Sequence, residues 1–425
     1  RSSGTGERAP SMPLPPSNQR VRVVCRLRPS TEKERIGGLG CTTEADNTIN
    51  IAPSERVPQP RSWNFDSVHG PASTQAEIYE EVGAPILDAV LSGYNGTVMA
   101  YGQTGAGKTH TLLHNTGSPE DAGLVPRLIA ALFVTISCDV RNVYKVRASF
   151  AQIYNEQVDD LIKPRNVNLK IHHGGSNEVE GLTITECRTA EDLLNLLQLG
   201  RRNLIYAETK MNKSSSRSHA VLQLRVSRRQ RVLDTSGVGS MHATQLTGKL
   251  SVVDLAGSER VKRSGSDEDA TGKRMREAIN INASLLGLSN VMKALSQGAQ
   301  HVPYRDSKLT YILQDSLGGN SKTLMFVNVG PASSNAAETL NSLAFAQRAK
   351  SVSLGKATKN KTAAAANANA QTSAPSRTQA DAHTHTHAPP RPGSAATTMA
   401  AAGRLGEGGA MRASPGPKKK AAARR

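Results

Sequence analysis

Cysteine is scarce in this sequence, and the spacing of the few present excludes a cysteine-based metal motif. The 425 residues include four cysteines, Cys25, Cys41, Cys138 and Cys187, which lie far apart. Zinc motifs need cysteine or histidine pairs a few residues apart, and small disulfide scaffolds need a much higher cysteine content. The four cysteines are therefore interpreted as reduced thiols of an intracellular protein.

Long apolar runs are also absent. No stretch of about 18 apolar residues occurs, so no membrane span is predicted, and the first residues lack the apolar segment of a signal peptide. No internal repeat is apparent, and no heptads flank the folded region, so no dimerising coiled coil is predicted. The chain begins at Arg1 and not at a methionine, so we expect it to be part of a longer protein.

Acidic residues are outnumbered by basic ones. The chain has 53 Lys and Arg against 35 Asp and Glu, a net charge of +18. Residues 355–425 hold twelve of the basic and two of the acidic residues, which gives +10 there and leaves +8 for the rest. This balance favours an acidic partner such as a nucleic acid, an anionic membrane or an acidic protein polymer, although a solvated basic tail is the simpler reading of 355–425.

Both ends of the chain are poor in large apolar residues. Residues 1–18 are rich in proline and serine, and residues 355–425 are basic and of low complexity. Such segments cannot bury enough apolar surface to offset their ordering entropy, so both are predicted to be disordered. One large α/β domain over residues 19–354 is therefore expected, although length alone would also suit two or three average domains.

The most informative motif is a complete phosphate-binding loop, GQTGAGKT, at residues 102–109. Its glycines let backbone N–H groups turn toward phosphates, Lys108 adds a point charge, and Thr109 offers a hydroxyl to Mg²⁺. The apolar run 97–101 is predicted to be the strand leading into the loop, and the following helix directs its positive dipole end at the same anion. The predicted ligand is a nucleoside triphosphate.

Strand and helix patterns alternate along the rest of the core, which favours a mainly parallel sheet covered on both faces. Predicted strands cover residues 21–25, 97–101, 145–154, 219–227, 248–254 and 324–329. Predicted helices cover 75–92 with a proline interruption, 124–137, 191–208, 276–297 and 337–350.

Two further segments have the residues to sense a γ-phosphate. Asp254 ends an apolar strand, where open α/β sheets bind ligands, and is predicted to hold Mg²⁺ indirectly. Gly257 offers an unobstructed backbone N–H, and the loop NKSSSRSH at 212–219 places several hydroxyls and an arginine ahead of a strand. Arg217 and Glu259 form a candidate ion pair between these two segments.

Together these motifs resemble the kinesin motor domain. The matching segments follow the family's order: VRVVCRLRP at 21–29, YNGTVMAYGQTGAGKTHT at 94–111, SFAQIYNEQVDDLI at 149–162, NKSSSRSH at 212–219, DLAGSER at 254–260, HVPYRDSKLT at 301–310, LQDSLGGNSKT at 313–323 and ETLNSLAFAQRAKSV at 338–352. Myosin has a similar phosphate loop. However, DLAGSE and SSRSH are the kinesin forms of the two switches, and HVPYRDSKLT has no myosin counterpart.

The resemblance implies an α/β, three-layer P-loop NTPase motor fold. Its central sheet would be mixed, mostly parallel and eight-stranded, with three helices on each face. The implied cofactors are ATP and Mg²⁺. The implied ATP-binding residues are Arg26, Arg28, Pro29, Gly102, Gln103, Thr104, Gly105, Ala106, Gly107, Lys108, Thr109 and His110.

The resemblance also assigns the chemistry of the two switches. Thr109 and Ser216 would ligate Mg²⁺, and Asp254 would hold the ion through water. The implied catalytic residues are Glu259, Arg217, Ser215 and Gly257. Glu259 would form a salt bridge with Arg217 and relay a proton with Ser215 from the attacking water, which suits a reaction that needs water positioning more than a strong base.

A basic microtubule-binding face is implied as well. Its residues are Arg260, Lys262, Arg263, Tyr304, Arg305 and Lys308. Basic groups fit this role because the tubulin surface is acidic and charge attraction raises encounter rates. The alternative for this segment is a solvated charged turn.

Three departures from the family pattern weaken the case for processive walking but leave ATP hydrolysis untouched. Ile279 and Ala283 stand where conventional kinesins often carry lysines, and the loop SGSDEDATGKRMREA before them is longer than usual. Residues 352–365 lack the alternating apolar residues that a docking neck segment needs, so no docking is expected there.

The predicted function is a microtubule-stimulated ATPase motor in the cytoplasm, on the cytoskeleton, with microtubules as partner and no specific nucleic acid. One alternative is a nonmotile regulator of microtubule dynamics that uses the same ATPase site. Another is a static tubulin-binding protein with a degenerate site. The intact set Lys108, Thr109, Ser216, Asp254 and Glu259 argues against the last of these.

Overall fold

The computed structural model describes residues 20–54, 57–115, 118–172, 178–210, 217–231, 244–259 and 273–363. All of them belong to the first of two compact units into which the chain divides, Arg1–Asn367. Within these ranges, no helix is long and apolar enough to cross a membrane. The predicted loop residues Ser215, Ser216, Arg260, Lys262 and Arg263 lie outside the described ranges.

A large mixed sheet forms the centre of the fold, and eight of its strands follow one another in a continuous path. In spatial order these are β5 (Ser67–His69), β1 (Arg22–Leu27), β12 (Lys322–Val329), β6 (Gly96–Tyr101), β11 (Thr244–Asp254), β10 (His219–Gln230), β7 (Asn142–Tyr154) and β8 (Gln157–Asp160). Pairing is parallel from β5 to β11 and antiparallel from β11 to β8. Two short strands extend the sheet, since β9 (Thr185–Cys187) pairs with β7 and β13 (Lys361–Ala363) pairs with β11.

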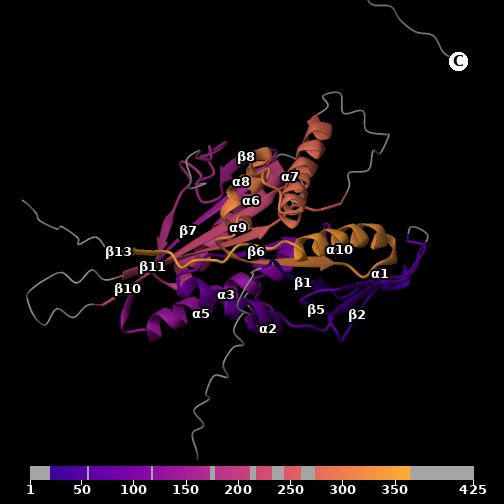
Figure 1. The fold of residues 1–425 in the computed structure, drawn as a ribbon, viewed down its shortest axis with the longest axis horizontal. Helices are drawn as coiled ribbons and strands as arrows, with labels where there is room; N and C mark the ends of the chain where they lie inside the picture. Colours follow the sequence, from indigo (N-terminus) through magenta and orange to yellow (C-terminus); the bar gives the residue numbers. More distant parts are fainter. Residues whose placement is uncertain are drawn as a thin grey trace, which may run out of the picture. The chain divides into compact units, whose positions relative to one another are not determined.

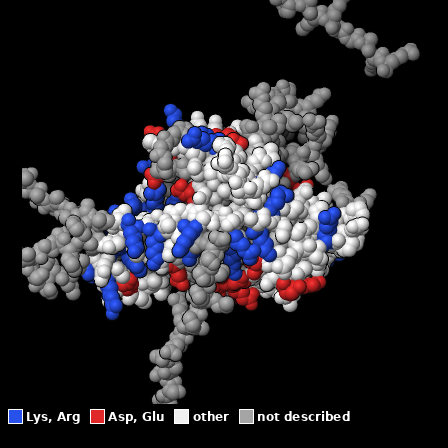
Figure 2. Space-filling view, in the orientation of Figure 1, with Lys and Arg blue, Asp and Glu red and all other residues white. Residues whose placement is uncertain are grey.

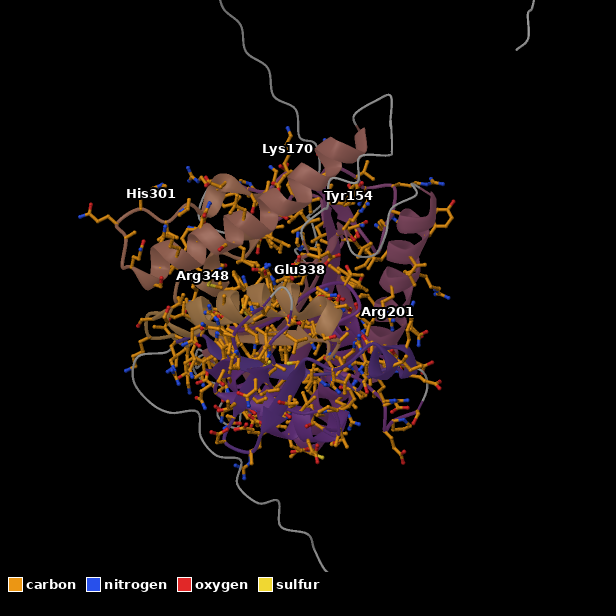
Figure 3. The ribbon with its side chains drawn as sticks, turned by 90° about the vertical axis from the view of Figure 1, so that its right-hand side faces the viewer. Tyr154, Lys170, Arg201, His301, Glu338 and Arg348 are labelled. Carbon is orange, nitrogen blue, oxygen red and sulfur yellow. The ribbon has the colours of Figure 1, made fainter. Side chains whose placement is uncertain are left out.

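Helices cover both faces of the sheet, which confirms the predicted three-layer fold (Figure 1). One apolar core lies under α2 (Gln75–Ile78), α3 (Ala84–Leu91), α4 (Lys108–Leu113), α5 (Leu124–Cys138) and α6 (Ala190–Lys210). A second core lies on the opposite face, under α7 (Lys273–Ser296), α8 (Lys308–Ile312), α9 (Gln314–Leu317) and α10 (Ala336–Lys350). Figure 3 shows α7 lying across α10, which carries Glu338 and Arg348.

Smaller elements surround these layers. A separate three-stranded sheet consists of β2 (Cys41–Glu44), β3 (Thr48–Ile51) and β4 (Arg61–Asn64). Helix α1 (Glu32–Ile36) follows β1, and the 3₁₀ turns η3 (Tyr304–Asp306) and η4 (Ser333–Asn335) precede α8 and α10.

The central strands have the composition that burial on both faces requires. Every residue of β6 is buried, and β12 is buried from Thr323 to Val329. A strand between two parallel neighbours, with helices above and below, has no solvent-facing side, so its sequence is a continuous apolar run without alternation. The run that leads into the phosphate loop is therefore the middle of the sheet.

The predicted helix over 75–92 forms in three pieces. After α2, residues Tyr79–Gly83 make a π-helical turn, and α3 then begins with Pro85 in its first turn. Proline lacks the N–H that an interior helical residue would donate, and its ring crowds the preceding turn, so it is tolerated only at a helix start. The widened turn lets the chain begin a new helix without leaving the sheet face.

Residues after α10 dock on the core, so the expectation for 352–365 is wrong over its described part. Val352, Leu354 and Ala357 are buried against the second core or beside it. The apolar residues are thus present, but they do not continue at every second position, which is the pattern that predicts a strand.

Polar contacts of Asn360 complete this docking. Its backbone N–H donates to the Gly93 carbonyl at 2.9 Å, and its carbonyl accepts from the Thr247 N–H at 3.1 Å. Its side-chain Nδ2 reaches the carbonyls of Gly93 and Thr247 and the Oδ1 of Asn95. Because these partners are distant in sequence, no local pattern could predict the contact.

Candidate nucleotide-binding site

The phosphate loop leaves the carboxyl end of β6 and enters α4. Gly102, with φ +142°, is the first residue of the loop, and a Cβ there would lie 2.1 Å from the carbonyl oxygen of Asn328 on β12. Only glycine fits so close to a neighbouring backbone. The loop is therefore pressed against the sheet, and its later residues face outward.

A cavity of about 1080 Å³ opens in front of this loop. Its volume suits a nucleotide, since small-molecule sites commonly span about 300–1,000 Å³. Predicted ATP-binding residues in its wall are Arg26, Arg28, Pro29, Thr104, Gly105, Ala106, Gly107, Lys108, Thr109 and His110, together with Asp254. Gly102 and Gln103 lie behind the wall and accept hydrogen bonds from Lys108.

Lys108 is held as a buried cation under the loop. Its Nζ donates to the carbonyl oxygens of Gly102 at 2.9 Å and Gln103 at 3.1 Å. Burial lowers the pKa of Lys108, and the nearby Asp254 and Glu259 carboxylates oppose that effect. The ammonium is thus fixed at the base of the phosphate loop.

Asp254, at the carboxyl end of β11, and Thr109, on α4, place two side-chain oxygens side by side. The Thr109 hydroxyl donates to Asp254 Oδ2, and burial raises the pKa of Asp254. Asp254 Oδ1 is buried and has no hydrogen-bond partner among the described residues. A hydroxyl beside a buried carboxylate with an unused oxygen fits a hard cation such as Mg²⁺.

Glu259 joins the predicted switch segment 254–259, the second switch, to the phosphate loop. Its carboxylate accepts from the Thr104 backbone N–H at 2.8 Å and from the Thr104 hydroxyl. A Cβ at Gly257 would lie 2.4 Å from both Glu259 Oε2 and Thr104 Oγ1, so a larger residue there would displace these two side-chain ends from their contact. Arg217 lies just before β10, and its predicted ion pair with Glu259 stays a prediction.

Three residues that the sequence motifs did not indicate, Glu34, Gln75 and Thr111, position the predicted ATP-binding residues Arg28 and Arg26. Arg28 donates to the Gly105 carbonyl at 2.7 Å and makes a two-pronged salt bridge with Glu34 at 2.7 and 2.5 Å. The salt bridge lowers the pKa of Glu34 to about 2. Arg26 is buried and donates to Gln75 and Thr111, and burial lowers its pKa to about 10. A capping box at Thr31 and Glu34 was the available sequence signal for the first contact.

Arg201 on α6 is a further cation at the cavity that the sequence analysis did not select. It lines the wall and donates to the Leu113 carbonyl at 2.8 Å, and its charge partly offsets the raised pKa of Asp254 (Figure 3).

His219 links three elements behind the site. Its Nδ1 accepts from the Ala256 N–H at 3.0 Å, so the ring proton lies on Nε2, which donates to Ser284 Oγ at 2.8 Å. Burial lowers the pKa of His219 to about 3, with a smaller effect from Lys108. The neutral imidazole therefore joins the end of β10, the second switch and α7.

Protonation of His219 should oppose folding, because the folded state excludes the extra proton. The unfolded pKa is about 6.5 and the folded value is about 3. The unfolded chain therefore gains a proton first as the pH falls, and stability is lost between these values. Between pH 7 and pH 5.5, the unfolding free energy of the wild type should fall by about 1 kcal/mol more than that of His219→Asn. Urea denaturation at the two pH values measures both falls. His301→Asn, which removes an exposed imidazole, is the matched control. An equal fall of unfolding free energy with pH in the wild type and in His219→Asn would contradict the buried, neutral His219.

The described residues of the predicted track-binding face lie on η3 and α8, which pack against α7. Arg305 is exposed, with its guanidinium 5.9 Å from the Tyr311 ring centre. Lys308 is partly exposed, and its backbone N–H donates to Glu156 Oε2 at 2.7 Å. Tyr304 is half-buried, and its carbonyl accepts from Thr310 Oγ1.

Comparison with known proteins gives a consistent family. A family model described as the kinesin motor domain matches residues 26–352. The chain is 38% identical to kinesin-like protein Klp68D of Drosophila melanogaster over 79% of its length, and 39% identical to kinesin-related protein 7 of Dictyostelium discoideum over 81%. It spans 42% and 27% of those two relatives. A solved structure of a fast kinesin is 37% identical, with a TM-score of 0.72, over 83% of this chain and 96% of the other.

Proposed function

Because the chain belongs to the kinesin motor domain family, whose members are microtubule-associated ATPase motors, we propose that it hydrolyses ATP at the phosphate-loop cavity and uses the reaction to move along microtubules. The proposal includes Mg²⁺, held by Thr109, by Ser216 and, through water, by Asp254. The ion would neutralise charge on the phosphate oxygens.

The other residues around the loop bind the phosphates, orient the attacking water or hold the adenine. Lys108 places its charge beside the β- and γ-phosphates, and the loop N–H groups hold the same oxygens. Glu259, with Ser215, orients the attacking water and passes on its proton. Arg28 and Pro29 hold the adenine, and the salt bridge from Glu34 keeps Arg28 in place.

One chain of contacts carries the proposal, because it connects the phosphate loop to the track-facing elements. Thr104 on the loop bonds Glu259, and Ala256 in the same switch segment bonds His219. His219 then bonds Ser284 on α7, which packs against α8. A change in the switch at the γ-phosphate would therefore move a helix next to Arg305 and Lys308.

A filament-gliding assay separates the motor from its alternatives. A motor fixed to a surface should propel microtubules in the presence of ATP and should not move them when ADP replaces ATP. A nonmotile regulator would hydrolyse ATP and change filament length without gliding. A static binding protein would hold filaments with no ATP turnover.

Removing the exposed track-facing charges should weaken microtubule binding. In a chain ending at Ala363, which keeps the docked segment and omits the basic residues beyond it, we expect Arg305→Ala with Lys308→Ala to lower affinity about tenfold at low salt. The loss should shrink as salt rises, because the Debye length falls from about 30 Å at 0.01 M to about 10 Å at 0.1 M. Co-sedimentation with microtubules at a series of salt concentrations measures the loss of affinity and its decrease with salt.

A matched double variant, Arg141→Ala with Arg231→Ala, removes two exposed cations far from α8 and should bind as the wild type does. ATPase activity without microtubules should be unchanged in both variants. Equal affinity of the Arg305 and Lys308 double variant and the wild type at low ionic strength would rule out this footprint.

A further inference from the structure

A second cleft lies at the opposite end of the sheet from the nucleotide cavity. The nucleotide cavity opens at the Asp254 end of β11, whereas this cleft opens at its Thr244 end. Its volume is about 300 Å³, and its lining residues are Asn142, Arg228, Gln230, Thr244, Leu246, Lys359 and Lys361. They come from β7, β10, β11 and the docked segment, and none of them is used by the proposed motor function.

Strand register places the cations of this cleft side by side. Tyr144, Arg228, Leu246 and Lys361 are directly paired across β7, β10, β11 and β13. Paired residues point to the same face of a sheet, so Arg228 and Lys361 flank Leu246 from its two sides. Lys359 lies just before β13 and also lines the cleft.

The positive charge of this cleft is only partly offset within the described part of the chain. No carboxylate lines the cleft, and Arg228, Lys359 and Lys361 form no ion pair with a described residue. Asp139, the nearby acid, accepts from Tyr144 and Asn142. Tyr144 also hydrogen-bonds Arg228. The hydrogen bond from Tyr144 lowers the pKa of Asp139 and the charge of Arg228 helps to lower it, so this carboxylate offsets part of one of the three charges. Figure 2 shows Lys and Arg gathered over the region where Figure 1 places β10, β11 and β13.

A fourth cation adjoins the cleft and increases the crowding. The ammonium groups of Lys322 and Lys359 lie 4.9 and 5.4 Å from the centre of the Tyr94 ring. Burial lowers the pKa of Lys322, and the charge of Lys359 lowers it further. Like charges held this close together gain from an anion between or beside them.

The cleft is separate from the track-binding face. Leu246 shares its strand face with Leu250, and Arg228 shares its face with Val226. Leu250 and Val226 belong to the core under α3, α5 and α6, whereas α8 packs on the other core. Contact with a microtubule through η3 and α8 therefore leaves this cation cluster unexplained.

The cleft is complete only while the segment after α10 is docked. Lys359 and Lys361 flank Asn360, whose hydrogen bonds to Gly93, Asn95 and Thr247 hold the segment in place. A ligand that binds these lysines binds the docked state more tightly than the undocked one, so it must favour docking.

We propose that this cleft binds a phosphoryl group and that binding stabilises the docked position of residues 355–363. A phosphoryl group carries close to two negative charges and three acceptor oxygens, which match one arginine from β10 and two lysines from the docked segment. Asn142, Gln230 and Thr244 add neutral donors at the wall. The cleft is large enough for such a group, supplied either as free phosphate or on a phosphorylated polypeptide.

The two sources are distinguished with the full chain while its nucleotide site is saturated with ADP and Mg²⁺. A fluorescent phosphoserine peptide is titrated by anisotropy, the same peptide without phosphate is titrated beside it, and inorganic phosphate is added as competitor. We expect the phosphopeptide to bind more tightly than its unphosphorylated form. Displacement by millimolar phosphate identifies a site for the free ion, and phosphopeptide binding that resists it identifies a polypeptide source. Equal binding of the two peptides would overturn the proposal.

Charge variants locate this binding. Arg228→Gln with Lys361→Gln should weaken phosphopeptide binding about tenfold, since two charge-assisted contacts are lost. Lys33→Gln with Arg35→Gln removes the same charge from exposed positions on α1 and should change affinity less than twofold. Equal losses in both variants would show attraction by overall charge alone and exclude the cleft.

An uncharged variant tests the coupling to docking. Asn360→Ala leaves every cleft cation in the chain but removes the side-chain contacts that hold Lys359 and Lys361, so affinity should fall about threefold or more. Asn341→Ala, on the exposed side of α10, is the matched control and should bind as the wild type does. Hydrogen exchange at β13 should also slow in the wild type when phosphopeptide is added. Unchanged affinity in Asn360→Ala, or unchanged exchange, would refute the coupling.

Discussion

Replacing Lys108 with alanine is expected to abolish ATP turnover, with a loss of at least about 10³-fold. Lys108 is the cation that the loop buries at its base, held by the carbonyls of Gly102 and Gln103. Electrostatic stabilisation of transferring phosphoryl groups in a preorganised site contributes rate factors of this size. Single-turnover phosphate release measures the loss in the rate of hydrolysis, and calorimetry measures any loss of ATP affinity.

The same substitution must be separated from loss of fold. Lys108→Met keeps most of the side-chain volume and removes only the charge, so it should fail in turnover as completely as Lys108→Ala. Lys163→Ala is a matched lysine substitution outside the cavity wall and should leave turnover unchanged. Phosphate release from Lys108→Met at the wild-type rate would show that the cavity is not the hydrolytic site.

Glu259→Ala should still bind ATP yet lose microtubule-stimulated hydrolysis by about 10²-fold or more. The phosphate loop, Lys108 and the Asp254–Thr109 pair are unchanged by this substitution, so the binding contacts survive. What is lost is the carboxylate that contacts Thr104 and closes the second switch on the loop. Steady-state hydrolysis with and without microtubules, beside ATP affinity, provides the test.

A second substitution distinguishes the closing contact from the proton relay. Thr104→Ala removes one hydroxyl donor and keeps the backbone N–H bond to Glu259, so it should cost far less activity than Glu259→Ala. Glu259→Gln keeps an acceptor for Thr104 but loses the charge and the basic oxygen, so it should behave like Glu259→Ala. Lost ATP affinity with turnover retained would contradict the assignment.

The parts of the fold that sequence patterns could predict are those set by local physics. The apolar run of β6 must lie inside a sheet, and the glycine spacing after it must turn around an anion, so both follow from neighbouring residues. The position of Asp254 at a strand's carboxyl end follows from the pattern of β11 in the same way.

The contacts that could not be predicted all join distant segments through polar atoms. Asn360 docks by bonding Gly93 and Thr247, and His219 reaches Ser284 on α7. Each is an ordinary polar residue in its own stretch of sequence. Its role appears only when the sheet order brings its partners near.

The sheet order also sets when the protein can fold during synthesis. β12 lies between β1 and β6, so Arg22 pairs with Leu324 from near the other end of the domain. Contacts of such high sequence separation slow folding, because the chain must lose loop entropy before they form. A nascent chain that has not reached Lys322 therefore presents the unpaired edges of β1 and β6, which are templates for aggregation. Ribosome-bound intermediates of this domain should consequently depend on chaperones until the last central strand emerges.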